Sequence, residues 1–229
     1  MKLSRRLELV ASFVEPGSRI ADVGTDHGYV PIWLVEQNTA VSAIAMDVRP
    51  GPLERAQKHI KLHGLEERIE TRLSDGVSKL NSGEADTVVI AGMGGELVIH
   101  ILEEGRHVWD SVVTWILSPQ SELDKVRRYL EDQGFCIVKE DMTCDEGKYY
   151  TVMKVIRGTM NLSRDSYYLY GKYLAEHKNP VLKEFLKKEK CLYQNVLKQL
   201  ELHGTEGSKS RKQEILLQLQ WIEEILNEM

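Results

Sequence analysis

The chain has 229 residues, of which 42% are apolar and 28% are charged, a composition typical of a globular protein and not of a disordered or fibrous one. Its formal net charge of −5 argues against a general nucleic-acid coat protein, although it does not exclude a local basic face. No stretch reaches the roughly 18 uncharged apolar residues of a membrane-spanning helix, and the N-terminus lacks the apolar segment of a signal peptide.

The first two thirds of the chain alternate helical patterns with short β-rich runs. Helices are expected at about 3–14, 28–38, 50–63, 94–105 and 121–133, and strands at 19–23, 42–47, 69–74, 86–91, 112–118, 135–139 and 149–156. Continuous apolar runs such as 87–91 are typical of strands buried on both faces, so the alternation predicts a doubly wound parallel sheet. The last two strands lack a helical pattern between them, which predicts five helix-linked strands followed by an antiparallel hairpin.

After residue 158 the strand-like runs end, and we expect two domains, 1–158 and 159–229. Pro180 fits the first turn of a long helix whose apolar residues recur at mostly three- and four-residue steps, through Leu182, Phe185, Leu186, Leu192, Val196 and Leu200. A loop is expected at 203–208. Beyond it, Ile215, Leu219, Ile222 and Leu226 form one apolar stripe. The pattern predicts an antiparallel, coiled-coil-like helical hairpin.

The turn from the first strand to the first helix of the sheet carries the sequence Asp-Val-Gly-Thr-Asp-His-Gly-Tyr at 22–29. Gly24 permits a tight turn and close approach of the backbone to a ligand, and Gly28 opens the helix. The spacing is G-x-x-x-G, and Asp22 and Asp26 flank the first glycine. These carboxylates would repel the pyrophosphate of NAD and attract a cationic ligand, which favours S-adenosylmethionine (SAM).

Two further acidic residues follow predicted strands. Asp47 ends the second strand, where a ribose diol is hydrogen-bonded in nucleotide-binding folds, and Asp75-Gly76 closes the third, where the adenine amino group would lie. The carboxyl ends of successive parallel strands meet at one edge of a sheet, so these acids converge on one crevice. Glycines at 92, 94 and 95 after the fourth strand leave room for a planar group.

The segments Asp-Val-Gly-Thr-Asp-His-Gly-Tyr, Ala-Gly-Met-Gly-Gly at 91–95 and Ser-Pro-Gln at 118–120 together resemble the bacterial TrmK family. Members are tRNA (adenine(22)-N1)-methyltransferases, with a class I, Rossmann-like SAM-methyltransferase domain on a seven-stranded sheet and a helical, coiled-coil-like domain. The resemblance covers the whole chain and implies the tRNA substrate and adenine N1 as target. Together with Asp22 from the loop, it places SAM binding at Gly24, Asp26, His27, Asp47, Asp75, Gly76, Gly92 and Met93.

Methylation at N1 of adenine needs no proton removal, because neutral N1 already has an in-plane lone pair. Catalysis then depends on positioning, and on a group near the N6 amine that stabilises the developing positive charge. Asp26 is the first candidate, with Tyr29 as a stacking or hydrogen-bonding partner. Asp26 as a pure ligand-binding or helix-capping residue remains an equal alternative. His27 either stacks on a base or is simply the helix N-terminus. A paired target base must leave its helix, because N1 lies on the Watson–Crick edge.

Basic residues in both domains are candidates for tRNA contacts. Arg5 and Arg6 are expected to edge the crevice, and a lysine cluster in the helical domain comprises Lys183, Lys187, Lys188 and Lys190. The cluster is either a phosphate-binding patch or a solvated helix face. The helical domain otherwise serves to stabilise its neighbour or to form a dimer contact, so a monomer or a weak homodimer is expected.

Other functions have weaker support. His59 and His63 stand four residues apart on a predicted helix, but no third ligand has suitable spacing, so no metal site is expected. Three cysteines without a CxxC pair favour a reducing cytosol, and we expect a cytoplasmic protein. The alternatives left open are a SAM-dependent methyltransferase acting on a small molecule and a non-catalytic protein that binds SAM and RNA.

Overall fold

The computed structural model describes residues 1–203 and 208–229, so most of the loop expected at 203–208 lies outside the described residues. The chain divides into two compact units, Met1–Asn161 and Leu162–Met229. In the described part of the chain, no helix is both long enough and apolar enough to cross a membrane.

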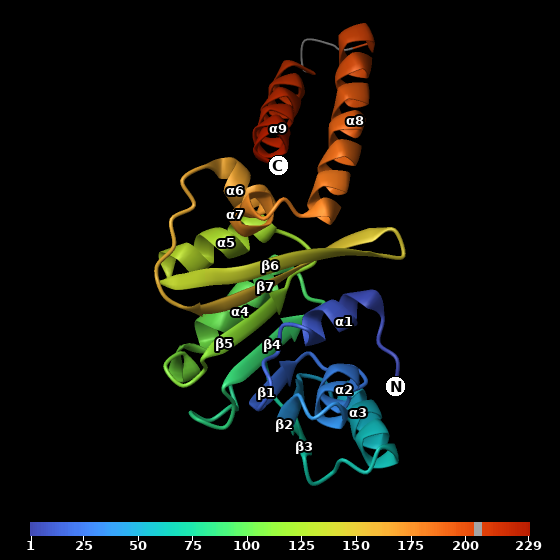
Figure 1. Cartoon of the computed structure of the whole chain (residues 1–229), viewed down its shortest axis with the longest axis vertical. Coiled ribbons are helices and arrows are strands. Elements are labelled where there is room, and N and C mark those ends of the chain that lie inside the picture. The colour runs from blue at the N-terminus through green and yellow to red at the C-terminus, as the bar shows by residue number, and fades with distance from the viewer. Residues whose placement is uncertain (204–207) are drawn as a thin grey trace. The chain divides into compact units, whose positions relative to one another are not determined.

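The first unit is built on one seven-stranded sheet (Figure 1). Its strands are β1 (Ser18–Val23), β2 (Ala40–Asp47), β3 (Ile69–Leu73), β4 (Thr87–Ala91), β5 (Thr114–Ser118), β6 (Phe135–Asp145) and β7 (Lys148–Arg157). The order across the sheet is β3-β2-β1-β4-β5-β7-β6. The first five strands pair in parallel, and β7 pairs antiparallel with both β5 and β6. The predicted parallel sheet with a terminal hairpin is therefore confirmed.

A tight turn makes the terminal hairpin possible. Glu146 and Gly147 separate β6 from β7 and both adopt positive φ angles, 49° and 79°. Two left-handed residues in succession match the right-handed twist of the flanking strands, which is the geometry of a two-residue hairpin turn. Both strands are longer than the sequence pattern indicates, because the hairpin pairs as far as Asp145 opposite Lys148.

Helices cover both faces of the sheet. They are α1 (Arg5–Ala11), α2 (Tyr29–Glu36), α3 (Pro50–Leu62), α4 (Gly95–Glu104), the short 3-10 helix η1 (Arg106–Val108) and α5 (Leu123–Asp132). The helices pack on two separate clusters of buried apolar side chains. One includes Val98 of α4 and Leu130 of α5, and the other includes Val10 of α1, Leu34 of α2 and Ala56 of α3. This is the expected doubly wound arrangement.

Two details differ from the expectation. The connection from β3 to β4 consists of turns and contains no helix, although the strands were expected to be linked by helices. Helix α1 is shorter than the predicted 3–14 because Ser4 ends it on the N-terminal side. The Ser4 hydroxyl accepts a hydrogen bond from the Leu7 amide, which is the role of an N-cap residue.

The second unit contains four helices in the described residues: α6 (Asp165–Tyr170), α7 (Lys172–Glu176), α8 (Pro180–His203) and α9 (Lys209–Glu228). The sequence did not separate the first two. Ion pairs between Lys190 and Glu223 (3.0 Å) and between Glu201 and Lys212 (3.1 Å) fix α8 and α9 as an antiparallel hairpin.

The apolar stripes of this hairpin are only partly as predicted. Leu182 and Leu186 of α8 are buried, as are Ile215 and Ile222 of α9. Leu192 was expected on the inner face of α8, but it is 60% exposed. The stripe on α9 also includes Ile225, which is fully buried. The stripes are therefore buried at these positions and only half-buried or exposed elsewhere, as at Leu219 and Leu192.

Candidate functional site

The loop after β1 forms the centre of the site. Gly24 has a φ of 79°, and the amides of Gly24 and Thr25 donate to the Met46 carbonyl of β2 (2.8 and 2.9 Å). Gly28, with a φ of 72°, is the N-cap of α2. Both glycines therefore occupy the left-handed region that other residues avoid, as the sequence pattern predicts.

A cavity of about 240 Å³ opens on one side of this loop. We call it the Asp26 cavity; its walls are Arg6, Leu7, Asp22, Gly24, Thr25, Asp26, His27, Tyr29, Val30 and Ala91. It brings together residues from the N-terminal helix, the loop after β1 and the end of β4. The sequence predicted five of the residues that line it as site residues from the loop and one, Arg6, from the first helix.

A smaller cavity of about 80 Å³ lies on the other side of Gly24. We call it the Asp47 cavity; its walls are Val23, Gly24, Asp47, Val48, Ser74, Asp75, Gly76, Met93, Leu97 and Ile101. The acids that follow β2 and β3 thus meet at one edge of the sheet. Gly24 is common to both cavities, so its backbone forms the boundary between them.

The φ of 79° at residue 24 favours glycine, and the Met93 side chain lies in the space next to it. A Cβ added at Gly24 would lie 2.1 Å from the Met93 Cε atom. The terminal methyl of Met93 therefore rests directly against the Gly24 backbone. This contact involves the flexible end of a side chain, which can shift without moving the main chain.

The carboxylates of the site differ in environment. Asp22 and Asp47 are both 7% exposed. Burial raises the pKa of Asp22 to about 6, and the nearby charge of Asp47 acts in the same direction. The Asp47 carboxylate accepts a hydrogen bond from the Arg49 amide (2.8 Å). A buried carboxylate next to a second one favours a cationic or hydroxyl-bearing ligand that relieves their repulsion.

Asp26 is exposed, and the side chains of Arg55 and His27 contact its carboxylate. Arg55 of α3 forms an ion pair with its carboxylate, and the His27 Nε2 atom lies 3.3 Å from the other carboxylate oxygen. The Arg55 guanidinium holds the pKa of Asp26 below its ordinary value. The sequence did not identify Arg55, because nothing in the local pattern of α3 distinguishes it from a solvated residue.

Three aromatic rings lie next to Asp26. The His27 and Tyr29 rings are nearly parallel with centroids 5.0 Å apart, and His59 lies 5.5 Å from each. The His59 Nδ1 atom is also 2.9 Å from the His27 carbonyl oxygen. His59 therefore supports the loop of the site. The two histidines therefore have different surroundings, since His63 is exposed and contacts Glu36 (2.6 Å).

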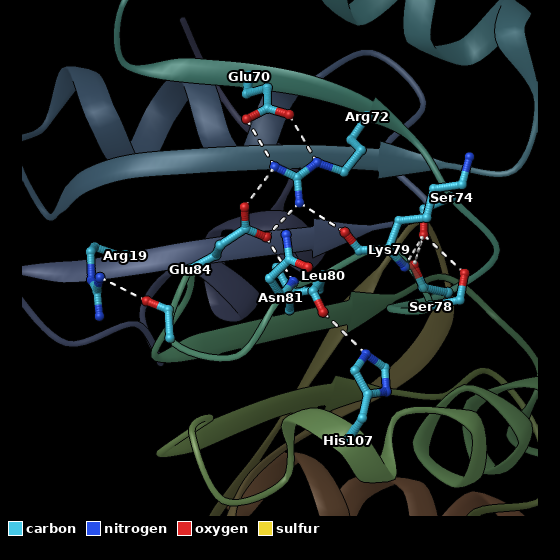
Figure 2. Close-up of polar contacts among 12 residues, drawn as sticks. Arg19, Glu70, Arg72, Ser74, Ser78, Lys79, Leu80, Asn81, Glu84 and His107 are labelled. Atoms are coloured by element: carbon cyan, nitrogen blue, oxygen red, sulfur yellow. Dashed lines mark hydrogen bonds and ion pairs between the residues drawn. The ribbon is translucent and has the colours of Figure 1, made fainter.

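The loop between β3 and β4, which carries Asp75 and Gly76, is held by a polar network around Arg72 (Figure 2). The Arg72 guanidinium donates to Glu84 (2.6 Å), to Glu70 (2.8 Å) and to the Lys79 carbonyl (2.9 Å). Ser74 donates to the Gly76 carbonyl (3.0 Å). This network fixes the start and the middle of the loop, and no pattern in the sequence predicts it.

The glycines after β4 serve different purposes. Gly92 has a φ of 84°, and a Cβ there would lie 3.4 Å from the Arg6 guanidinium. A Cβ at Gly95 would lie 2.6 Å from the Ser121 carbonyl oxygen. Gly95 therefore allows α4 to pack against the loop after β5. The expectation that all three glycines make room for a planar ligand is wrong for this position.

The basic residues are distributed unevenly. Arg6 lines the Asp26 cavity and packs over the Tyr150 ring (5.2 Å), whereas Arg5 is exposed and lines neither cavity. In the second unit, Lys188 pairs with Glu184 (2.7 Å) and Lys190 pairs with Glu223. Over residues 1–203 and 208–229, no ion pair involves Lys183 or Lys187, and no cluster of three metal-ligating side chains occurs.

Comparisons with known proteins match this architecture over its full length. A family model described as a methyltransferase domain matches residues 3–153. The chain is 31% identical over 233 residues to the tRNA (adenine(22)-N(1))-methyltransferase of Bacillus subtilis, covering 99% of this chain and 98% of that one. The crystal structure of the B. subtilis m1A22 tRNA methyltransferase TrmK has a TM-score of 0.86 at 31% identity, with 98% and 99% covered. Sp1610 of Streptococcus pneumoniae in complex with S-adenosyl-L-methionine has a TM-score of 0.88 at 38% identity, with 98% and 100% covered.

Proposed function

The chain belongs to the TrmK family, SAM-dependent enzymes that methylate N1 of an adenine in tRNA to give 1-methyladenosine, and we propose that its two cavities divide this task. The Asp47 cavity takes the adenosine part of SAM, and the Asp26 cavity takes the methionine part and the target adenine. The observation that carries this proposal is the meeting of acids from three neighbouring strand ends around the Gly24 backbone.

The residues present fit SAM. Asp47, buried at the end of β2, accepts hydrogen bonds from the ribose diol, and the Asp75–Gly76 segment meets the adenine. Asp22 faces the ammonium group of the methionine part, a partner that offsets the cost of burying an ionised carboxyl. His27, Gly92 and Met93 complete the walls of the binding site. When bound, SAM supplies the methyl group on a sulfonium centre.

Asp26 acts on the target adenine. Its ionised carboxylate accepts a hydrogen bond from the N6 amine and stabilises the positive charge that builds on the ring. Arg55 and His27 keep this carboxylate ionised and oriented. Tyr29 stacks against the base or holds it by its hydroxyl group. No side chain needs to remove a proton, because N1 attacks through its own lone pair.

The tRNA extends beyond the pocket. Arg6 lies at the cavity and Arg5 on the same helix, where they meet the phosphates that flank the target nucleotide. Lys183 and Lys187, which have no acidic partner in the described residues, are the stronger candidates of the predicted lysine cluster. We assign Lys188 and Lys190 a weaker role. The tRNA substrate implies a cytoplasmic enzyme, and we keep the monomer or weak homodimer that the sequence predicts.

The test is methyl transfer from radiolabelled SAM to unmodified bacterial tRNA, followed by nucleoside analysis of the digest. Label in 1-methyladenosine is expected. Asp26→Asn is expected to lower turnover at saturating SAM while leaving SAM affinity within about threefold, since Asp26 acts on the base. Label in a small molecule instead of RNA would indicate the alternative methyltransferase, and SAM and tRNA binding without transfer would indicate a non-catalytic protein.

A further inference from the structure

A third cavity of about 340 Å³ adjoins the Asp26 cavity and is not used in the reaction described above. We call it the Tyr29 cavity; its walls are Met1, Lys2, Leu3, Ser4, Leu7 and Tyr29. Its volume falls at the lower end of the range of about 300–1,000 Å³ that is usual for small-ligand pockets. The two cavities share Leu7 and Tyr29. An RNA strand that leaves the Asp26 cavity past these two residues therefore enters the Tyr29 cavity.

The lining of the Tyr29 cavity fits a flat, largely apolar group attached to an anion. Leu3, Leu7 and the Tyr29 ring supply apolar surface, and Tyr29 is 39% exposed. The Tyr29 ring is held parallel to the His27 and His59 rings, so it is a rigid platform. At the rim, Lys2 is exposed and has no ion-pair partner among the described residues. The Ser4 hydroxyl is already committed to capping α1.

We infer that the Tyr29 cavity binds the nucleobase next to the target adenosine in the RNA, with Lys2 against its phosphate. Aromatic side chains bind single-stranded bases by stacking regardless of base identity, and cations follow the backbone. A base that leaves its helix to be methylated takes its neighbour out of regular stacking, and this cavity gives the neighbour a new partner. The inference rests on the proposed function, because it extends the same substrate path.

The test compares three synthetic tRNAs: intact, and abasic at the position on the 5′ or the 3′ side of the target adenosine. With the wild-type enzyme, removal of one of the two neighbouring bases is expected to lower kcat/KM by about 5- to 100-fold, mainly through KM, as loss of one stacked base would. In Tyr29→Leu, the ratio of kcat/KM for intact tRNA to kcat/KM for abasic tRNA is expected to approach one. Tyr29→Phe, which keeps the ring and loses only the hydroxyl, is expected to keep the wild-type ratio.

A second pair of variants tests the phosphate side. Ser4→Asp and Ser4→Asn both retain an N-cap acceptor for α1, so they preserve the helix equally. Only Ser4→Asp places a negative charge beside Lys2, and it alone is expected to raise KM for intact tRNA, by about threefold or more.

The outcomes distinguish a failure of the neighbouring-base site from a failure of the proposed function. If the wild-type enzyme methylates both abasic tRNAs as well as the intact one, the neighbouring-base site is refuted while the methyltransferase activity stands. If an abasic tRNA loses activity to the same degree in Tyr29→Leu, the loss comes from the fold of the RNA, and the site is again refuted. If intact tRNA is not methylated at all, the proposed function itself fails.

Discussion

At the level of a single residue, the proposed role of Asp22 in SAM binding predicts a dependence on pH. Its folded-state pKa of about 6 lies above its ordinary value of 3.8 because it is buried. A raised carboxyl pKa contributes stability that is fully present below pH 3.8 and is lost as the pH rises through about 6. Binding of a cationic ligand has the opposite dependence, because it requires the ionised carboxylate.

We therefore expect SAM affinity to fall by up to about tenfold per pH unit below pH 6, while the unliganded protein gains stability from this group. Calorimetric titration of SAM between about pH 5 and 8 measures the first effect. Asp22→Asn is expected to bind SAM more weakly at pH 8 and to lose the dependence near pH 6. Equal pH profiles for the variant and the wild-type protein would contradict the role of Asp22.

A second prediction about single residues concerns Arg55, which forms an ion pair with Asp26. The pair is exposed, so its contribution to the free energy of unfolding is about 0–1 kcal/mol. Its effect on catalysis is expected to be larger, because we propose that Asp26 touches the reacting base, and a small displacement of such a group is costly. Arg55→Ala should lower kcat by about 10- to 100-fold with little change in melting temperature or in KM for SAM.

The matched control for this prediction lies on the same helix. Lys58 is exposed, and no ion pair involves it within the described chain. Lys58→Ala removes a cation from α3 without touching Asp26 and should keep wild-type kcat. A kcat for Arg55→Ala equal to that of Lys58→Ala would show that Asp26 needs no such partner.

The β3–β4 connection shows how an element without regular structure is made rigid. Glu84 accepts hydrogen bonds from Arg72 and from the Asn81 amide (2.7 Å), which lower the pKa of Glu84 to about 2. Figure 2 shows these contacts together with the His107 ring, which lies 3.1 Å from the Leu80 carbonyl oxygen. The loop thus keeps Asp75 and Gly76 in place without a helix.

Arg72→Ala is expected to lower the free energy of unfolding by about 1–3 kcal/mol, because it removes the donor that links Glu70, Glu84 and the Lys79 carbonyl. The freed loop should also weaken SAM binding, by about tenfold, since one wall of the Asp47 cavity loses its support. Thermal unfolding and SAM titration measure the two effects. Arg106→Ala is the control, because it removes a paired arginine that lines neither cavity. It should lower the melting temperature without changing the affinity for SAM. Unchanged SAM affinity in Arg72→Ala would contradict this account of the loop.

At the scale of the whole molecule, an acidic protein of net charge −5 must bind a polyanion through a few local cations. The structure separates the lysines of α8 by their partners. Lys183 and Lys187 have no acidic partner in the described chain, whereas Lys188 and Lys190 are neutralised by Glu184 and Glu223.

The double variant Lys183→Ala/Lys187→Ala is expected to reduce the slope of log KM for tRNA against log salt by about 2. Lys188→Ala/Lys190→Ala removes the same charge from the same helix and should change the slope much less. Steady-state kinetics at several salt concentrations measures both. If the two double variants behave alike, ion pairing within the hairpin does not decide which lysines bind tRNA.

The sequence by itself determined the sheet, its hairpin and the acids of the crevice. Buried parallel strands must be apolar, and the residues that follow them are carried to one edge of the sheet by the topology. Asp22, Asp47 and Asp75 were therefore predictable from their place in the chain. Gly24 and Gly28 were predictable as well, because other residues rarely adopt their backbone angles.

Only the tertiary structure decided which groups face those residues. Arg55 lies 29 residues from Asp26 in the chain, and no periodicity marks it as a partner. The Met93 methyl on Gly24, the cluster of His27, Tyr29 and His59, and the division of the lysines into paired and unpaired depend likewise on distant elements. Local sequence patterns record which residues are buried and how the backbone turns, whereas pairing between distant side chains depends on how the elements pack. That packing is set by the fold as a whole.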